Sequence, residues 1–402
     1  MTVRHGWLRT AALVLALASL SACSSAADHA TSPSPAPAES PSPRATTAVS
    51  PSPRALPGGW EAEALPGRLR PVVATTDGTR LVVSGGAGSG DDAEPRLLLR
   101  GERGWEDVRL TPETGYGRVA SLVELAVAPD GSVVALGNAT GGAHLMPRWT
   151  AWSGTLDRVD EKPQVFETFG GPSAGGLAGV ASAPVATVIG SWATSPSRLS
   201  PAVWREDGGR WLRRTDVGAF ADRGDVQALP AAVAATEAHV VVVGTETTTD
   251  AAGTRQAAVA WRTSDLGRWE RFPLTDPAGS GVSSGATDVS CAADGCVVAG
   301  WVGPRLAGWR LDRQGVERLR PPPVAVEPYV ARPRAAYDGS CVALAAGQES
   351  RDLVASTDGV RWRAMPVPQP EVTDLALVGG RLFALAPDAG TPLVARDDAC
   401  RR

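Results

Sequence analysis

The sequence predicts an all-β fold, a single seven-bladed β-propeller that covers about residues 58–402. Three observations lead to this prediction. A strand–turn–strand pattern recurs seven times after residue 58. Each repeat has room for two hairpins, which make the four strands of a propeller blade. The two ends of the domain also complement each other as parts of one blade.

The N-terminus has the pattern of an export signal. Arg4 and Arg9 precede an apolar run at 11–20, which is too short for a finished membrane span. The residues Leu20-Ser21-Ala22-Cys23 resemble the lipobox of bacterial lipoprotein signal peptides. The resemblance implies a signal peptide at 1–22, cleavage before Cys23 and diacylglycerol on its sulfur. A secreted protein with a chance cysteine is the alternative.

The composition of segment 23–57 predicts that it is a disordered stalk. It consists mainly of Ser, Pro, Ala and Thr, and Ser-Pro-Ser-Pro occurs at 32–35, 40–43 and 50–53. Such a composition offers too little apolar surface to pack and favours extended polyproline II conformations. At roughly 3.1 Å per residue the stalk would reach on the order of 100 Å, as a spacer through the cell wall.

The first hairpin of each repeat has an apolar segment, a tight turn and a Val-rich strand that closes on Gly. The second repeat has Asp130-Gly131 before its Val-rich strand, and the fifth has Asp294-Gly295. Asp-Gly between apolar runs favours a two-residue hairpin turn. Six or eight blades, or a pair of β-sandwiches, are the alternatives.

A second hairpin, which usually ends in Trp, follows in each repeat, as at 203–211, 259–269 and 353–362. The C-terminal segment Leu393–Arg402 aligns with the first strand and the turn of this hairpin, as at 353–361 plus one position, and stops where the fourth strand of the blade should begin. The segment Gly58–Leu65 matches that missing strand. We therefore expect the N-terminal strand to close the ring, which removes free sheet edges.

Four cysteines remain after Cys23. Cys291 and Cys296 flank an Asp-Gly turn and can face each other across a hairpin, and Cys341 and Cys400 then pair by elimination. An even number of thiols outside the cytoplasm favours disulfides. A zinc site is the alternative, but the spacing of the close pair is wider than the usual zinc knuckle. The sequence predicts no metal site and no cofactor.

Charge and composition indicate which classes of partner and which type of genome the sequence favours. The chain has 39 basic and 43 acidic residues, a net charge of −4. Removal of Arg4 and Arg9 with the signal gives −4 − 2 = −6. The absence of a basic patch argues against nucleic acid as a partner. Lys162 is the only Lys, which is typical of a high-GC actinobacterial genome.

The segment Ser356–Trp362 resembles the Asp-box of sialidases and related BNR-repeat propellers, one residue short and without its Thr. In that family the box shapes a turn away from the catalytic face, so the resemblance does not imply hydrolysis. The sialidase set of an Arg triad, a Tyr–Glu pair and an Asp is not recognisable here. His144 and His239 are the only His of the domain, and both are expected in solvated loops. We nominate no catalytic residue.

Two aromatic residues are the candidate ligand-binding residues. Trp192 and Trp301 follow the second strand of their repeats, where loops emerge on the face opposite the Asp-Gly turns. There they could stack on a sugar or hold a peptide, or else pack against the neighbouring blade.

The sequence therefore predicts a non-catalytic lipoprotein on the outer face of the cytoplasmic membrane. Its propeller would bind a protein or glycan of the cell envelope, or act as a scaffold. A sialidase-like glycoside hydrolase is the alternative, and the oligomeric state is open.

Overall fold

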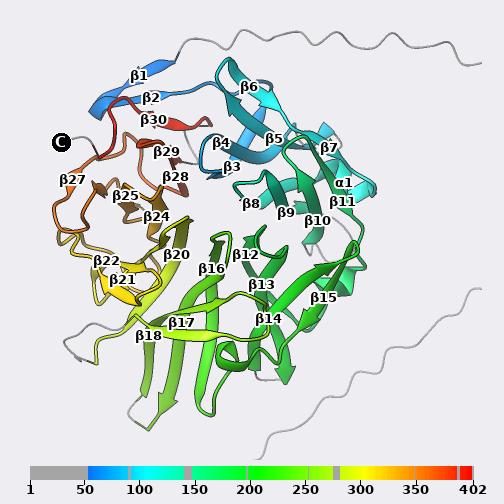
Figure 1. The fold of residues 1–402 in the computed structure, drawn as a ribbon, viewed down its shortest axis with the longest axis vertical. Coiled ribbons are helices and arrows are strands. Elements are labelled where there is room, and N and C mark those ends of the chain that lie inside the picture. Colours follow the sequence, from blue (N-terminus) through cyan, green and yellow to red (C-terminus); the bar gives the residue numbers. More distant parts are fainter. Residues whose placement is uncertain are drawn as a thin grey trace, which may run out of the picture. The chain divides into compact units, whose positions relative to one another are not determined.

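The computed structural model describes residues 53–88, 92–139, 147–195, 198–251, 253–274, 281–347, 349–386 and 390–400. Within them the strands form seven sheets that surround a central axis, as the blades of a propeller do (Figure 1). The predicted fold class and the number of blades are confirmed. The signal peptide, Cys23, nearly all of the stalk and His144 lie outside the described residues.

The blades follow one another along the chain, and each is counted from its innermost strand outwards. Blade 1 contains β3 (Leu69–Thr76), β4 (Leu81–Ala87), β5 (Glu94–Gly101) and β6 (Gly104–Asp107). Blade 2 contains β8 (Ser121–Val127), β9 (Ser132–Ala139), β10 (Arg148–Thr155), β11 (Arg158–Lys162) and the added β7 (Arg109–Thr111). Blade 3 contains β12 (Ala174–Ala181), β13 (Thr187–Ser195), β14 (Arg198–Asp207) and β15 (Arg210–Arg214). Blades 4 and 5 contain β16 (Val226–Ala235), β17 (Val240–Asp250), β18 (Gly253–Thr263) and β19 (Glu270–Pro273); and β20 (Ser284–Ala292), β21 (Gly295–Val302), β22 (Arg305–Leu311) and β23 (Val316–Arg318).

Blades 6 and 7 contain β24 (Arg334–Tyr337), β25 (Val342–Ala345), β26 (Leu353–Ser356) and β27 (Arg363–Ala364); and β28 (Asp374–Val378), β29 (Arg381–Leu385), β30 (Leu393–Ala395), β2 (Trp60–Ala62) and β1 (Arg54–Leu56). The described helices are short: α1 (Gly115–Val119), η1 (Pro57–Gly59), η3 (Phe166–Thr168) and η4 (Gly218–Phe220). No helix among the described residues is long and apolar enough to cross a membrane.

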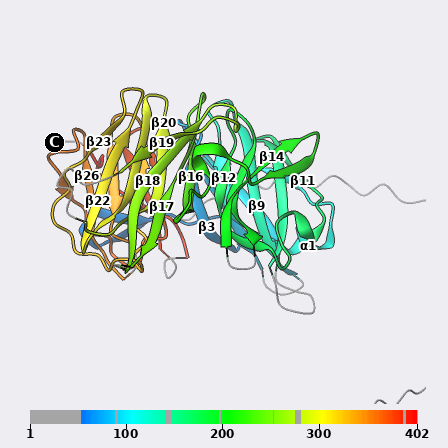
Figure 2. The ribbon, with the colours of Figure 1, turned by 90° about the horizontal axis from the view of Figure 1, so that it is seen from below.

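The strands run between two faces (Figure 2). We call the face that carries the first hairpin turns, such as Asp294-Gly295, the turn face. The other face, which carries the turns between second and third strands and the connections between blades, is the connection face. The Asp-box-like segment lies on the turn face, where Ser356 Oγ accepts from Gly359 N at 2.9 Å and Asp358 Oδ1 accepts from Arg361 N at 2.8 Å.

The core lies between the blades, because each sheet packs both of its faces against a neighbour. In blades 2 to 5 one position of the third strand is a tryptophan that is at most 1% exposed: Trp152, Trp204, Trp261 and Trp309. The second strands supply the Val side chains against which these rings pack. Large aromatic side chains fill the wedge between adjacent blades and bury much apolar area.

The ring is closed as the sequence predicts. Trp60 of β2 pairs with Ala395 of β30, is fully buried, and donates its indole Nε1–H to the carbonyl of Pro366 at 3.1 Å. The sheet begins four residues earlier than the expected boundary at Gly58, because β1 pairs with β2 as a fifth strand. Three residues are too few for a recognisable strand pattern.

Both predicted disulfides are present. Cys291–Cys296 crosses the β20–β21 hairpin, with Cα atoms 4.0 Å apart. Cys341–Cys400 joins blade 6 to the C-terminal segment that follows β30, with Cα atoms 5.8 Å apart. The second bridge therefore fastens the blade that the N-terminal strand completes.

Blade 2 has a fifth strand that the repeat pattern did not predict. β7 pairs parallel with β11. Glu161 of β11 is buried, and its carboxylate accepts from Glu113 N at 2.7 Å, Thr114 N at 2.8 Å and Thr114 Oγ1 at 2.6 Å. These hydrogen bonds hold the segment between β7 and α1 against the blade, since a buried carboxylate must be satisfied.

Candidate functional site

The seven innermost strands line a central channel with a cavity of about 1170 Å³. Residues from both faces line it, from Asp77 at the turn face to Tyr329 at the connection face. A concave site with convergent polar groups is the default location for binding or catalysis in a fold of this kind.

One level of the channel wall carries a cluster of charged residues. In five innermost strands the register shifts by one residue at the same place, which is a β-bulge. Alignment on the second strand gives one equivalent residue per blade, and we call these seven residues the ring: Val73, Glu124, Gly179, Ala232, Asp288, Arg334 and Asp374. Four of the seven are ionisable.

Two of the ring carboxylates bind backbone amides of the next blade. Asp374 Oδ2 accepts from Ala74 N of blade 1 at 2.8 Å, and Asp288 Oδ2 accepts from Ala335 N of blade 6 at 2.9 Å. Ala74 and Ala335 are themselves equivalent residues. An innermost strand leaves one edge unpaired, so each Asp satisfies an amide that would otherwise be unpaired in the channel wall.

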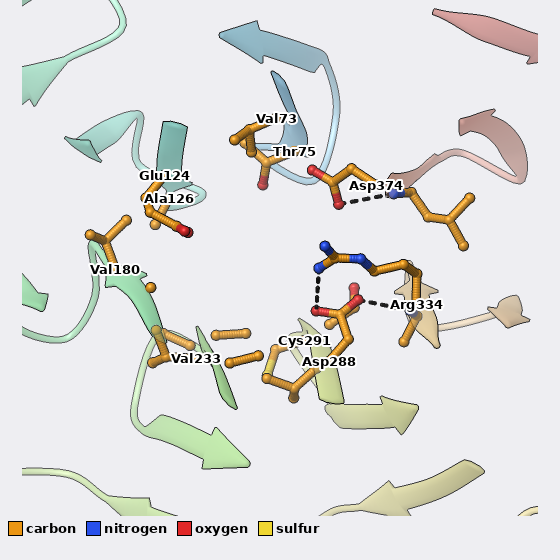
Figure 3. Close-up of a pocket in the computed structure, with 18 of the residues that line it drawn as sticks. Val73, Thr75, Glu124, Ala126, Val180, Val233, Asp288, Cys291, Arg334 and Asp374 are labelled. Atoms are coloured by element: carbon orange, nitrogen blue, oxygen red, sulfur yellow. Dashed lines mark hydrogen bonds and ion pairs between the residues drawn. The ribbon is translucent and has the colours of Figure 1, made fainter. Parts of the chain in front are cut away.

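Arg334 lies between these two aspartates (Figure 3). It belongs to blade 6, whereas Asp288 belongs to blade 5 and Asp374 to blade 7. Its Nη1 is 3.8 Å from Asp288 Oδ1. Burial opposes the charge on the guanidinium, but attraction to Asp288, Asp374 and Glu124 raises the pKa of Arg334. The buried Nε of Arg334 has no hydrogen-bond acceptor among the described residues.

Glu124 lies across the channel from Arg334 (Figure 3). Its Oε2 lies close to Gly179 of the next blade: a Cβ atom placed on this glycine would be 3.5 Å from the Oε2. No donor in the described part of the chain makes a hydrogen bond to this carboxylate. Burial raises the pKa of Glu124 to about 7, with the negative charges of Asp374 and Asp288 adding to the effect and Arg334 opposing it.

The other carboxylates of the ring are shifted in the same direction. Burial raises the pKa of Asp374 to about 7, against the attraction of Arg334 and with repulsion from Asp288. Burial also raises the pKa of Asp288. Three carboxylates therefore face one guanidinium, an excess of negative charge that protonation of a carboxylate or a bound cation would reduce.

The structure places Trp301 within β21, not after the strand as the sequence suggested. The residue is 2% exposed. Its indole packs on Gly285 of β20, where a Cβ would lie 2.8 Å from the ring. The ring of Tyr329 covers it edge-on, with 4.9 Å between centroids. Ligand binding by Trp301 stays a prediction.

Trp192 likewise lies within a strand, β13, and is partly exposed. Its ring meets Trp204 edge-on at 6.1 Å between centroids. The guanidinium carbon of Arg213 is 3.5 Å from the centroid of Trp192, and burial lowers the pKa of this Arg. A ligand that stacks on the ring face covered by Arg213 would have to displace this side chain. The binding role of Trp192 also stays a prediction.

Tyr337 and His239 are titratable residues outside the ring. Tyr337 is buried and donates its hydroxyl proton to Asp294 Oδ2 at 2.6 Å. His239 lies in the β16–β17 turn, where burial and nearby Arg262 lower its pKa. The described residues contain no group of three or more Asp, Glu, His or Cys arranged to hold a metal ion.

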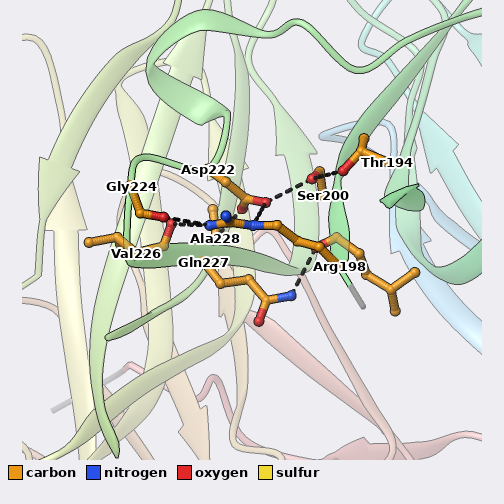
Figure 4. Close-up of polar contacts among 9 residues, drawn as sticks. Thr194, Arg198, Ser200, Asp222, Gly224, Val226, Gln227 and Ala228 are labelled. Atoms are coloured by element: carbon orange, nitrogen blue, oxygen red, sulfur yellow. Dashed lines mark hydrogen bonds and ion pairs between the residues drawn. The ribbon is translucent and has the colours of Figure 1, made fainter. Parts of the chain in front are cut away.

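A second polar cluster lies near the connection face, at the junction of blades 3 and 4 (Figure 4). Asp222 Oδ2 accepts from Arg198 Nε at 2.8 Å and from Ser200 Oγ at 2.7 Å, and its Oδ1 accepts from Ala228 N at 2.9 Å. Both carboxylate oxygens are thus satisfied inside the protein. We assign this cluster to the packing of the two blades.

The ring was not nominated from the sequence, although a signal for it is present. Thr287-Asp288-Val289 and Thr373-Asp374-Leu375 repeat one pattern, a charged residue inside an apolar innermost strand. A buried ionisable residue in such a strand indicates a special environment.

The comparisons with known proteins reach solved structures only. No protein-family model and no curated protein matches the chain. BamB from Moraxella catarrhalis is 13% identical, with 85% of this chain and 92% of that chain covered and a TM-score of 0.44. The β-propeller domain of the Trilobed protease from Pyrococcus furiosus is 9% identical, with 79% and 89% covered and a TM-score of 0.48.

A third similar structure is the Myceliophteria thermophila Cps50 (Swd1) β-propeller domain. It is 11% identical, with 82% of this chain and 96% of that chain covered and a TM-score of 0.48. At these identities and TM-scores the comparisons carry no argument about function.

Proposed function

We propose that this chain is a lipoprotein of the outer face of the cytoplasmic membrane whose propeller binds a protein partner through its connection face. The lipobox-like residues at 20–23 and the Pro/Ser-rich segment support this cellular location. Acyl chains on Cys23 would hold the chain on the membrane, and the stalk would carry the propeller away from it.

The observation that carries the binding role is the conformation of Tyr329. This residue has a φ of 68° although it is not glycine, and its side chain is 59% exposed. Such a backbone costs roughly 1–3 kcal/mol and is found at functional sites. Tyr329 lines the mouth of the channel, and the next residue, Val330, is 47% exposed, so an aromatic and an aliphatic residue are exposed side by side in the chain.

Other exposed apolar side chains support this face. Large apolar residues that are exposed in or beside its loops are Tyr116, Val165, Leu199, Val282, Tyr329 and Val330. Among the described residues in the hairpin turns of the turn face, Val360 is the large apolar residue that is exposed. Aromatic and aliphatic residues exposed on one face favour a protein partner. Sugar stacking on Trp301 would require its covered ring to be exposed.

The test is site-specific photo-crosslinking in cells that make the protein. A photoreactive residue at Val330 should give one discrete adduct, and one at Val360, which is 55% exposed on the turn face, should give none. Tyr329→Ala should remove the Val330 adduct if contact at the mouth is specific. Absence of any adduct at Val330, or equal adducts at both positions, would contradict binding through this face.

A glycoside hydrolase is the second candidate, because the ring lines the channel with carboxylates whose pKa values are raised, and Arg334 lies beside one of them, Asp288. A general acid needs a carboxyl group that is protonated near neutral pH, as Glu124 and Asp374 are in part. Incubation with fluorogenic glycosides at about pH 6 to 7 tests this candidate. Hydrolysis that Glu124→Gln abolishes would replace the binding role with catalysis.

A further inference from the structure

Glu124 differs from the other two acids of the ring. Asp288 and Asp374 each accept a hydrogen bond from a backbone N–H of the next blade, at the residue that follows the ring residue of that blade. The donors are Ala335 N for Asp288 and Ala74 N for Asp374. The equivalent amide for Glu124 belongs to Val180, and no hydrogen bond joins the two. Glu is one methylene longer than Asp, and its Oε2 lies over Gly179. The ring thus contains a carboxylate that the described residues leave without a donor.

The charges of the ring determine which ligand fits there. Arg334 is the single cation of the ring, and it is already close to Asp288. An anion would add a fourth negative charge beside three carboxylates, whereas a cation would bring the ring nearer to neutrality. Glu124 faces Arg334, Asp288 and Asp374 across the channel, and these are the charged groups coupled to it.

The surroundings favour an organic cation. Ala126, Val180 and Val233 line the channel near Glu124 (Figure 3), so an alkyl chain would find apolar contacts there. An arginine or lysine side chain supplies both a positive charge and an alkyl chain, while an inorganic ion supplies only charge.

We infer that the channel binds an arginine or lysine side chain of the protein partner, with the Glu124 carboxylate as its counter-ion. This inference rests on the proposed function, because the side chain would enter from the connection face, past Tyr329. It names the chemistry by which the partner is recognised: a basic residue flanked by apolar ones.

The experiment measures binding of a small probe to the purified full-length chain by titration calorimetry or ligand-observed NMR. N-acetyl-L-arginine amide is the probe, and N-acetyl-L-citrulline amide is its neutral match in shape. At about pH 8, where Glu124 is ionised, we expect the arginine probe to bind at least about tenfold more tightly, as a charge-assisted hydrogen bond requires. Equal binding of both probes would overturn the inference.

Two variants assign the effect to Glu124. Glu124→Gln should reduce the affinity for the arginine probe by about tenfold or more and leave the citrulline probe unchanged. Glu317→Gln on the exposed part of β23 is the matched control and should change neither. A thermal melt of each variant establishes that it is folded. Unchanged affinity in a folded Glu124→Gln would overturn the inference.

The outcome separates this inference from the proposed function. If the Val330 adduct forms but the arginine probe does not bind, the cation site is refuted and partner binding stands. If the probe binds through Glu124 but no adduct forms, the cation site is supported and binding through the connection face is refuted.

Discussion

Replacement of Glu124 by Gln should make the domain more stable at alkaline pH and leave it unchanged at acid pH. Burial raises the pKa of Glu124 from 4.5 to about 7, so the folded state holds its proton more tightly than the unfolded state. The stability that this proton contributes is complete below about pH 4.5 and is lost as the pH rises through about 7. Gln cannot ionise, so the variant avoids the loss.

The size of the effect follows from the shift. One pKa unit corresponds to about 1.4 kcal/mol, which sets an upper limit of about 3 kcal/mol at pH 8. Glu124 keeps partial solvent access, so we expect a gain of about 1–3 kcal/mol in the free energy of unfolding.

The assay is urea denaturation of the wild type and the variant at about pH 4 and pH 8. Glu317→Gln, an exposed replacement of the same type, corrects for the general loss of one negative charge. A gain at pH 8 that vanishes at pH 4 supports the reasoning. If Glu124→Gln is no more stable than the control at pH 8, or if the gain is equal at both pH values, the reasoning is refuted.

Three further predictions concern the anchor and the closure of the ring. Cys23→Ala should move the protein from the membrane fraction to the soluble fraction, and persistent membrane attachment would refute the lipid anchor. Trp60→Ala should lower the free energy of unfolding by about 3–5 kcal/mol, because a fully buried indole is lost from the closing strand; an unchanged denaturation midpoint would contradict this closure. Loss of the Cys341–Cys400 bridge should cost about 2–4 kcal/mol. Loss of Cys291–Cys296 should cost less, because that bridge spans 5 residues and not 59; calorimetry that ranks them the other way would refute this order.

The repeats, the hairpins and the closing strand were predictable from the sequence, because each depends on local patterns. Asp294-Gly295 between apolar runs specifies a tight turn whatever lies around it, and the same turn brings Cys291 to Cys296. The match between Gly58–Leu65 and the outer strand of another repeat was enough to predict closure. Five cysteines, one of them in a lipobox-like motif, left few ways to form disulfides.

The ring of charged residues was decided by the tertiary structure alone. Glu124, Asp288, Arg334 and Asp374 lie on four different blades and come to one level only when the sheets close into a circle. Each is a single charged residue in an apolar strand, and a strand pattern does not say which side chain meets which across a channel. The same holds for Trp192 and Trp301: sequence locates them near strand ends, but the packing of Arg213 and Tyr329 over their rings depends on neighbouring segments. Local sequence specifies the blades because turn and strand propensities act over a few residues, whereas the site depends on long-range packing that brings distant side chains together.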